Sequence, residues 1–485
     1  MVETFAGDVN GGHHGNNPPV VLVEFNELSP VLMDRFIEAG HLPNFKRMRD
    51  ESEVCISVAE EKPPHLEPWI QWVDVHTGVP YSQHGISALS QGHNLRYKSV
   101  WSVVSDAGWP VWVCGSMNVQ YKEGTRGYIL PDPWATDFPP YPGELKPYFY
   151  FIQQNVLEYT NKRVPLTKSD YLKFMMFMLG HGLSFTTFDA AVWQLLSEKR
   201  TGCGRWRRAF IMDRLQFDMF SAIYRRLKPR FSTFFLNSTA HMQHSYWRHM
   251  QPELFTVDPK SDEQRQYASA ILQGYQEMDG LLGRLLMLVG NQAIVILATA
   301  LSQQPCLVYE EKGGKHGYRV SDHTRLIAFT GVTSPYRCAP VMAGQFWIHL
   351  ESMSNADDVE LRLRTLRLGE KHVIATRREG SSVFASCSIT QAIDSDAVVH
   401  IEDTEQAAPF FSLFYDSGIM KSGMHHPDGI LWIRHLHHRH CVRPGKVPLI
   451  SIAPTILDIL GLPKPPEMNG ASLLANPTGS TLIAA

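Results

Sequence analysis

Residues 231–249, FSTFFLNSTAHMQHSYWRH, combine a strand-like run with a cluster of polar side chains. The apolar, β-branched and aromatic run 231–236 is typical of a short strand buried on both faces. The run ends at Asn237, and a polar cluster that includes His241 and His244 follows at once. In open α/β sheets, ligands bind just beyond the carboxyl ends of the strands, so this cluster is the default candidate site. The alternative is an ordinary helix start, capped by a hydroxyl side chain.

Length and composition indicate a globular protein with a large core. The chain has 485 residues, of which 44% are hydrophobic and 11% aromatic, and its formal net charge is -3. This charge provides no extended basic face, so we expect no nucleic-acid partner. The seven cysteines are odd in number and never form a CxxC pair, which favours a reducing compartment over a disulfide framework.

No targeting or membrane-spanning segment is evident. Residues 1–17 are rich in Gly, Asn and His without an apolar core, and we interpret them as a disordered tail rather than a secretory signal. The most apolar helix candidate, YLKFMMFML at 171–179, is too short to span a bilayer. We therefore expect a cytoplasmic protein that acts on a small molecule, without nucleic acid or membrane as a partner.

Strand-like and helix-like segments alternate along most of the chain. Short apolar runs at 20–25, 110–114, 231–236 and 293–298 resemble buried parallel strands, and amphipathic helices separate them. The predicted fold class is α/β, with a mostly parallel central sheet and helices on both faces. We predict a core made of 18–117, 231–325 and 420–485, a helical cap insertion at 118–230 and a small α+β insert at 326–419.

The closing segment resembles a known family. PTILDILGLP at 454–463, followed by MNG at 468–470, is similar to the end of alkaline phosphatase superfamily proteins, in the branch of type I phosphodiesterases, nucleotide pyrophosphatases and sulfatase-like proteins. TGVP at 77–80, HGI at 84–86 and the helix 275–283 resemble further elements of that branch. The resemblance implies an alkaline phosphatase-like fold and a two-metal site with a Thr or Ser nucleophile.

The chain departs from the ligand pattern that this resemblance implies. Asn26 and Asn237 stand where aspartates are expected, and Glu67 occupies the approximate place of the nucleophile. Ala300-Leu301 replaces an Asp-His pair, so the second metal site has lost its ligands. The tripeptide Ser321-Asp322-His323 has the expected residues further along the chain, which leaves open a rebuilt second site.

The remaining polar residues predict one divalent metal ion, with zinc favoured and iron or manganese as alternatives. Its predicted ligands are His241, His425, Glu67 and Asn237, with His426 as an alternative to His425. Predicted catalytic residues are Glu67, Asn26 and His244, and predicted substrate-binding residues are Asn26, Asn237, Gln303 and Trp69.

Three functions are consistent with this site. The first is a metal-dependent enzyme with a mononuclear site that hydrolyses or transfers a group on a small anionic metabolite, such as a phosphate or sulfate ester. The second is an inactive pseudo-phosphatase that binds a ligand or a partner protein in the vacant cleft. The third is a redox enzyme with non-haem iron on two histidines and one carboxylate.

Overall fold

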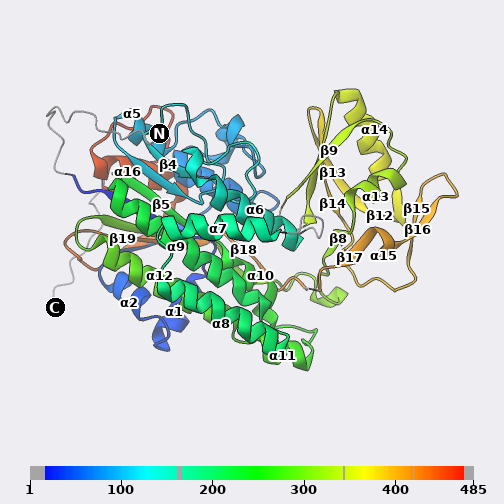
Figure 1. Ribbon diagram of the computed structural model, residues 1–485, viewed down its shortest axis with the longest axis horizontal. Coiled ribbons are helices and arrows are strands. Elements are labelled where there is room, and N and C mark those ends of the chain that lie inside the picture. Colours follow the sequence, from blue (N-terminus) through cyan, green and yellow to red (C-terminus); the bar gives the residue numbers. More distant parts are fainter. Residues whose placement is uncertain (1–16, 161–165, 342–343, 419, 475–485) are drawn as a thin grey trace.

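The computed structural model describes residues 17–160, 166–341, 344–418 and 420–474 (Figure 1). The predicted disordered tail, 1–17, therefore lies outside the described residues except for Asn17. Among the helices in these ranges, none is both long and apolar enough to cross a bilayer.

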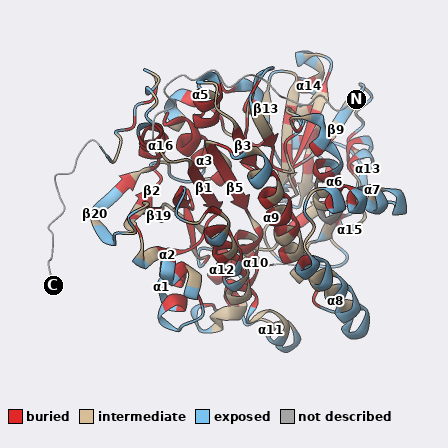
Figure 2. Cartoon of the chain, turned by 60° about the vertical axis from the view of Figure 1, so that its left-hand side comes forward, coloured by how far each residue is buried: buried red, intermediate tan, exposed pale blue. Residues whose placement is uncertain are grey.

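The centre of the molecule is a mostly parallel sheet of eight strands (Figures 1 and 2). Its strands, in spatial order, are β20 (Cys441–Pro448), β2 (Glu53–Val58), β19 (Asp428–Arg434), β6 (Ile294–Ala298), β1 (Val20–Phe25), β5 (Phe231–Leu236), β3 (Val111–Cys114) and β4 (Gly127–Leu130). Only β19 runs antiparallel to its two neighbours, β2 and β6. The predicted α/β class with a mostly parallel central sheet is confirmed.

Side chains of β1 alternate between two hydrophobic cores, because successive residues of a strand point to opposite faces. Val21, Val23 and Phe25 belong to one core, and Val20 and Leu22 belong to the other. The first core is covered by α1 (Pro30–Glu38), α2 (Pro43–Asp50), α9 (Arg208–Leu227), α10 (Ser238–Met250) and α12 (Ala270–Val289). The second is covered by α3 (Pro68–Thr77), α5 (Val100–Asp106) and α16 (Ile452–Leu460).

The stretch 118–230, which was predicted as a helical cap, also contributes to the sheet and to its cover. Its first strand, β4, pairs with β3, and its last helix, α9, packs its buried residues Phe217 and Phe220 into the first core. Between them lie α6 (Lys146–Thr160), α7 (Lys168–Gly180) and α8 (Phe185–Thr201). The helix α11 (Ser261–Tyr267) precedes α12.

An α+β unit projects beside the main sheet, as Figure 1 shows, and its residues Ala339 and Trp347 belong to the second core. It contains two four-stranded sheets and its own hydrophobic cluster. Its elements are β8 (Tyr318–Val320), α13 (His323–Phe329), β9 (Tyr336–Pro340), β10 (Phe346–Leu350), α14 (Met353–Arg364), β11 (Leu366–Leu368), β12 (Lys371–His372), β13 (Ile374–Glu379), β14 (Ser382–Cys387), β15 (Val398–Ile401), β16 (Ala407–Pro409), α15 (Phe410–Leu413) and β17 (Phe414–Asp416). The chain enters this unit after β7 (Ser302–Pro305) and returns through β18 (Gly423–His426), and these two strands pair antiparallel.

Candidate metal centre

The turn after β1 places a carboxylate above the carboxyl edge of the sheet. Glu27 follows Asn26 and has a φ of 61°, in the left-handed region that few residues other than glycine adopt. Its backbone N–H donates to the Thr299 carbonyl oxygen at 3.3 Å, and its own carbonyl accepts from Gln243 Nε2 at 2.8 Å. These bonds hold the unusual backbone conformation, and such strain is commonly retained at functional sites.

The Glu27 carboxylate is buried and is met by two imidazoles. Its Oε2 lies 3.0 Å from His244 Nε2 and 3.4 Å from His425 Nε2. Gln303 Nε2 donates to the same oxygen at 2.5 Å, and Asn26 Nδ2 donates to Oε1 at 2.8 Å. Burial alone would raise the pKa of Glu27, but the charges and hydrogen bonds of His425 and His244 outweigh it and hold the pKa well below its ordinary value.

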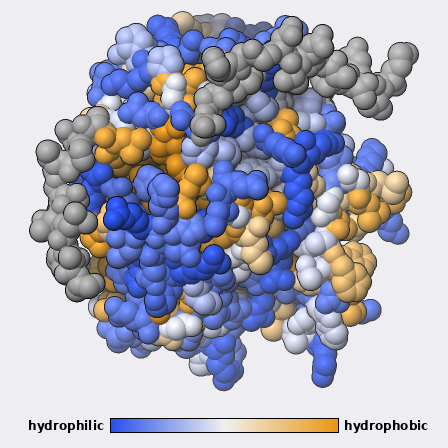
Figure 3. All heavy atoms as spheres, turned by 90° about the vertical axis from the view of Figure 1, so that its left-hand side faces the viewer, coloured by the Kyte–Doolittle hydropathy of each residue, from blue (hydrophilic) through white to orange (hydrophobic). Residues whose placement is uncertain are grey.

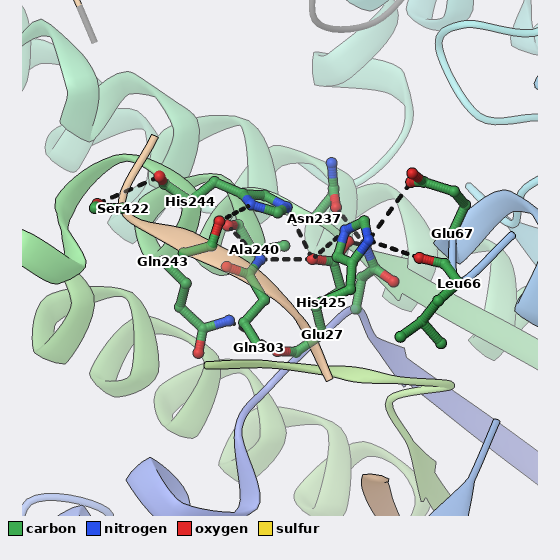
Figure 4. A network of polar contacts seen from close by, with 12 residues as sticks. Glu27, Leu66, Glu67, Asn237, Ala240, Gln243, His244, Gln303, Ser422 and His425 are labelled. Atoms are coloured by element: carbon green, nitrogen blue, oxygen red, sulfur yellow. Dashed lines mark hydrogen bonds and ion pairs between the residues drawn. The ribbon is translucent and has the colours of Figure 1, made fainter. Parts of the chain in front are cut away.

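Both imidazole rings are oriented by backbone carbonyls (Figure 4). His244 Nδ1 lies 3.0 Å from the Gly423 carbonyl oxygen, and His425 Nδ1 lies 2.8 Å from the Leu66 carbonyl oxygen. A carbonyl oxygen only accepts, so each Nδ1 carries the proton that it donates, and each Nε2 faces Glu27. This is the tautomer in which Nε2 of a neutral ring can bind a metal, with a backbone group fixing the ring.

The two rings differ in their protonation behaviour. Burial lowers the pKa of His244, and the attraction of Glu27 does not fully offset it. Burial also lowers the pKa of His425, but Glu27 and then Glu67 outweigh it, so this pKa is raised. Glu27 and Glu67 together favour the protonated form of His425 more than Glu27 favours that of His244, and a cation at this site would compete with this proton.

Glu27, His244 and His425 are arranged to hold one metal ion. One ligand atom from each residue lies within 4.8 Å of the other two, and no second group of this kind occurs within the described residues. Two imidazole nitrogens and one carboxylate oxygen suit zinc, iron or manganese, and leave coordination positions for other ligands.

Glu67 lies at the edge of this group rather than inside it. It is the residue before α3, and its Oε2 is 3.5 Å from His425 Nδ1. Burial raises the pKa of Glu67, against the opposing charges of His425, Lys421 and Lys315. Glu67, which the sequence predicted as a metal ligand together with His425, therefore lies next to the His425 ring but outside the three-residue group.

The two asparagines position Glu27 through hydrogen bonds. Asn26 Nδ2 donates to Glu27 and, at 2.7 Å, to Asn237 Oδ1, while Asn26 Oδ1 accepts from Trp72 Nε1 at 2.8 Å. Both functional ends of the Asn26 amide are thereby occupied within the protein. Asn237 immediately precedes α10, the helix that carries His244.

Other predicted site residues are brought to the same region in different roles. Gln303 is buried and donates to Glu27 and to the Ala240 carbonyl. His241 lies on the turn of α10 before His244 but outside the three-residue group, and burial is the main cause that lowers its pKa to about 4. Trp69 donates to the Ser87 carbonyl oxygen at 3.1 Å and packs against the second core.

Strand β18 distinguishes the two adjacent histidines. His425 pairs with Gln303 of β7 and faces Glu27, whereas His426 pairs with Ser302, and its Nδ1 accepts from the Asp428 N–H at 3.2 Å. Alternation along the strand therefore directs His425 to the site.

The alternative second metal site is not assembled. Asp322 caps α13 in the α+β unit, where its Oδ1 accepts from the Arg325 N–H at 2.9 Å, and His323 packs edge-on against Phe346. Ala300 and Leu301 are fully buried in the second core.

Sequence analysis missed Glu27. The resemblance directed attention to Asn26 as the last residue of the strand, and the acidic residue directly after it was not considered. A carboxylate directly after a fully buried strand, at an edge where histidines also gather, is the signal that could have identified it.

Two lysines add positive charge at the rim of this group. Lys421 N–H donates to the Lys315 carbonyl oxygen at 3.0 Å, where the chain enters and leaves the α+β unit. The charges of both lysines lower the pKa of Glu67, and Lys421 also acts on both site histidines.

Comparison with known proteins gives one short sequence match and several distant structural ones. No family model matches the chain. Over 34 residues it is 68% identical to a 2,3-bisphosphoglycerate-independent phosphoglycerate mutase from Desulforudis audaxviator (strain MP104C), a match that spans 7% of this chain and 6% of that protein.

Three solved structures match most of the chain at low identity. A murine ectonucleotide pyrophosphatase/phosphodiesterase 5, in an inactive form with AMP, is 11% identical with a TM-score of 0.40, over 94% of this chain and 97% of that one. Wild-type alkaline phosphatase PafA is 12% identical with a TM-score of 0.45, over 95% and 99%. Phosphonoacetate hydrolase from Sinorhizobium meliloti 1021, with phosphonoacetate, is 14% identical with a TM-score of 0.40, over 92% and 96%.

Proposed function

We propose that this chain is a metal-dependent hydrolase whose single divalent ion is held by Glu27, His244 and His425. The observation that carries the proposal is the arrangement of the two imidazoles. Each donates its Nδ1 proton to a backbone carbonyl and turns Nε2 toward one buried carboxylate. Packing alone does not require that two imidazoles have fixed tautomers and direct their Nε2 atoms at the same carboxylate oxygen, whereas metal binding does.

The donor set fits one ion and not the two-metal site that the sequence resemblance implies. Asn26 and Asn237 hydrogen-bond to each other, and Ala300 and Leu301 carry no ligand atoms in their side chains. A divalent ion held by the remaining three groups would supply Lewis-acid polarisation of a substrate or water oxygen. Zinc is our first choice, because two imidazoles and a carboxylate are a common zinc set with an open position.

The chain's own residues provide the other parts of such a reaction. Glu67 is placed beside His425, and its raised pKa makes its carboxylate a better acceptor for the proton of an attacking water. Lys315 and Lys421 would neutralise an anionic substrate at the rim. We therefore propose a small anionic ester, such as a phosphate or sulfate ester, as the substrate.

The same donor set supports a second candidate. Two histidines and one carboxylate also form the usual ligand set of non-haem iron oxygenases, so a redox activity at this site is the alternative. Dioxygen-dependent turnover in the iron-loaded protein would support this alternative over hydrolysis.

Metal content tests the ligand assignment directly. We expect about one equivalent of metal in the purified wild-type protein by plasma mass spectrometry, and a large loss in Glu27→Gln and His244→Ala. His241→Ala is the matched control, because His241 lies on the same helix outside the group. Retained metal in His244→Ala together with loss in His241→Ala would contradict the assignment, and two equivalents in the wild type would contradict a mononuclear site.

Turnover tests the reaction. We expect hydrolysis of p-nitrophenyl phosphate, bis-p-nitrophenyl phosphate or p-nitrophenyl sulfate by the wild type, and a fall of about 10²- to 10⁴-fold in Glu67→Gln with metal retained. Metal bound without turnover of any of these esters would move the assignment to the redox candidate. The absence of metal would favour a ligand-binding module.

A further inference from the structure

Two helices of the predicted cap expose a large apolar surface. Their outward side chains, each at least 38% exposed, are Tyr171, Leu172, Met175, Met176 and Leu179 on α7, and Phe185, Phe188, Val192, Trp193, Leu195 and Leu196 on α8. We call these eleven residues the apolar cap face. In Figure 2 both helices lie at the right-hand side of the molecule and are coloured largely as exposed. In Figure 3 the side that carries them is seen in profile on the right, where apolar side chains project.

The apolar cap face is periodic and lies largely outside the core. On α7 the exposed residues recur at i, i+4 and i+8, whereas Phe174, Phe177 and Met178 on the other side fill the first core. On α8, all of whose residues the structure describes, Thr187 alone is buried. Tyr171 contacts the buried Phe151 edge-on, but most of the area of these stripes is exposed, and an exposed apolar patch usually marks an interaction site.

The segment that carries this face has a net positive charge, most of it near the C-terminal end of α8. Residues 168–208 contain seven Lys or Arg and three Asp or Glu, a formal charge of +4 in a chain whose total is -3. Two of the three acids are engaged: Asp170 in the capping box at the start of α7, and Glu198 in an ion pair with Arg208. Asp189, four residues after Phe185, is the remaining acid and lies on the stripe itself.

Lysines and arginines stand at the ends of the stripes. Lys168 opens α7, and Lys199 and Arg200 follow Leu196 at the end of α8 by three and four residues. Long basic side chains in these positions can extend toward a charged surface while apolar neighbours are buried beside them.

The charge distinguishes between the possible occupants. A second copy of this chain in a two-fold dimer would bring the same surface against itself, so +4 would face +4. A bilayer that contains anionic lipid offers an apolar interior for the stripes and negative headgroups for the basic residues. Aromatic residues such as Trp193 and Phe185 are well suited to the boundary between headgroups and acyl chains.

We propose that the apolar cap face docks peripherally on an anionic lipid bilayer, with α7 and α8 lying in the interface. This mode of binding needs no spanning helix, and α8, with 17 residues, lies flat rather than across. The sequence analysis expected no membrane partner because it found neither a spanning segment nor a targeting signal. Peripheral docking through exposed side chains requires neither of these. The proposal is independent of the metal centre.

Vesicle sedimentation tests the proposal with the full chain. We expect the wild type to sediment with vesicles of equal parts phosphatidylserine and phosphatidylcholine at low salt, and to bind pure phosphatidylcholine far more weakly. The double variant Phe185→Asp/Trp193→Asp should lose at least about tenfold in partitioning. Lys199→Glu/Arg200→Glu should also weaken binding, by about fivefold for each cation removed.

The matched control is Met287→Asp/Leu361→Asp, because these side chains are 73% and 65% exposed and lie on α12 and α14. It should bind vesicles as the wild type does, and circular dichroism should show that every variant is folded. The proposal is overturned if the wild type fails to sediment with anionic vesicles, or if the cap and control doubles lose binding equally. A concentration-dependent dimer that only the cap double disrupts, without vesicle binding, would also overturn it and identify a second copy as the occupant.

Discussion

The buried pair of Arg248 and Glu310 gives a prediction whose magnitude can be worked out. Arg248 lies on α10, one turn after His244, and Glu310 lies on the segment that leads from β7 to the α+β unit. The pair is bidentate, with Nη2 to Oε1 at 2.6 Å and Nη1 to Oε2 at 2.9 Å. Glu310 Oε2 also accepts from the Thr256 N–H at 2.9 Å. Replacing Glu310 by glutamine removes the negative charge and little of the volume.

The cost of Glu310→Gln follows from the pKa. The hydrogen bond from Arg248 is the main cause that lowers the pKa of Glu310 from 4.5 to about 2. At about 1.4 kcal/mol per pKa unit, this shift corresponds to roughly 3 kcal/mol of folding free energy at neutral pH. Because the folded pKa lies below the unfolded one, the contribution is complete above about pH 4.5 and is lost as the pH falls toward 2.

Urea unfolding followed by far-UV circular dichroism measures this difference. Wild type and Glu310→Gln should differ by roughly 3 kcal/mol at pH 7, and the difference should shrink as the pH falls below 4.5. The control is Glu402→Gln, whose partner Arg367 and whose own side chain are more exposed, and for which we expect a change below about 1 kcal/mol. A difference that is the same at pH 7 and pH 3, or as small as in the control, would refute the reasoning.

Three further substitutions test how the site and its surroundings are held. Asn26→Asp removes two hydrogen bonds donated by Nδ2 and places a second carboxylate beside Glu27. We expect the free energy of unfolding in urea to fall by about 2–4 kcal/mol, and a fall below about 1 kcal/mol would show that the amide is dispensable. In Gly423→Ala the new Cβ would clash with the Gln243 carbonyl oxygen and with Gln303 Oε1. We therefore expect β18 to shift and the metal content to fall well below one equivalent, whereas an unchanged metal content would show that the strand tolerates the substitution. Asp279→Ala removes the carboxylate that accepts from the Asn44 and Phe45 N–H groups at the start of α2, at 2.9 and 2.8 Å. We expect the free energy of unfolding in urea to fall by about 1–3 kcal/mol, whereas no change would show that water replaces the carboxylate.

Sequence patterns were sufficient for the centre of the fold. The predicted strands at 20–25 and 231–236 match β1 and β5, and 293–298 differs from β6 by one residue. These short runs are rich in apolar, β-branched and aromatic residues, which is typical of a buried parallel strand. The polar strands β7 and β18 were not predicted. Their residues include glutamines and histidines, and they pair with each other across more than a hundred residues, so no local pattern marks them.

The candidate site could be predicted only in part for a related reason. His425, Glu67 and Gln303 were singled out and do meet, since they lie near the carboxyl edge of the sheet. One backbone torsion decides whether residue 26 or residue 27 faces the candidate metal site. The rotation of α10 about its axis decides which of its histidines faces that site. The positive φ of Glu27 turns its side chain into the site, and the rotation of α10 brings His244 rather than His241 to it. Neither feature leaves a periodic signal in the sequence.

The isolated β-bridge between Lys315 and Lys421 brings the two ends of the α+β unit together. The chain departs at one of these residues and comes back at the other, with their backbones directly hydrogen-bonded. Because the two ends already touch, the length of what is spliced between them has only a weak entropic effect on the core. A short hairpin in place of residues 316–420 would leave Glu310 with Arg248 and His425 opposite Gln303. It would also remove Ala339 and Trp347 from the second core, so an exchanged unit has to supply apolar side chains at these two positions.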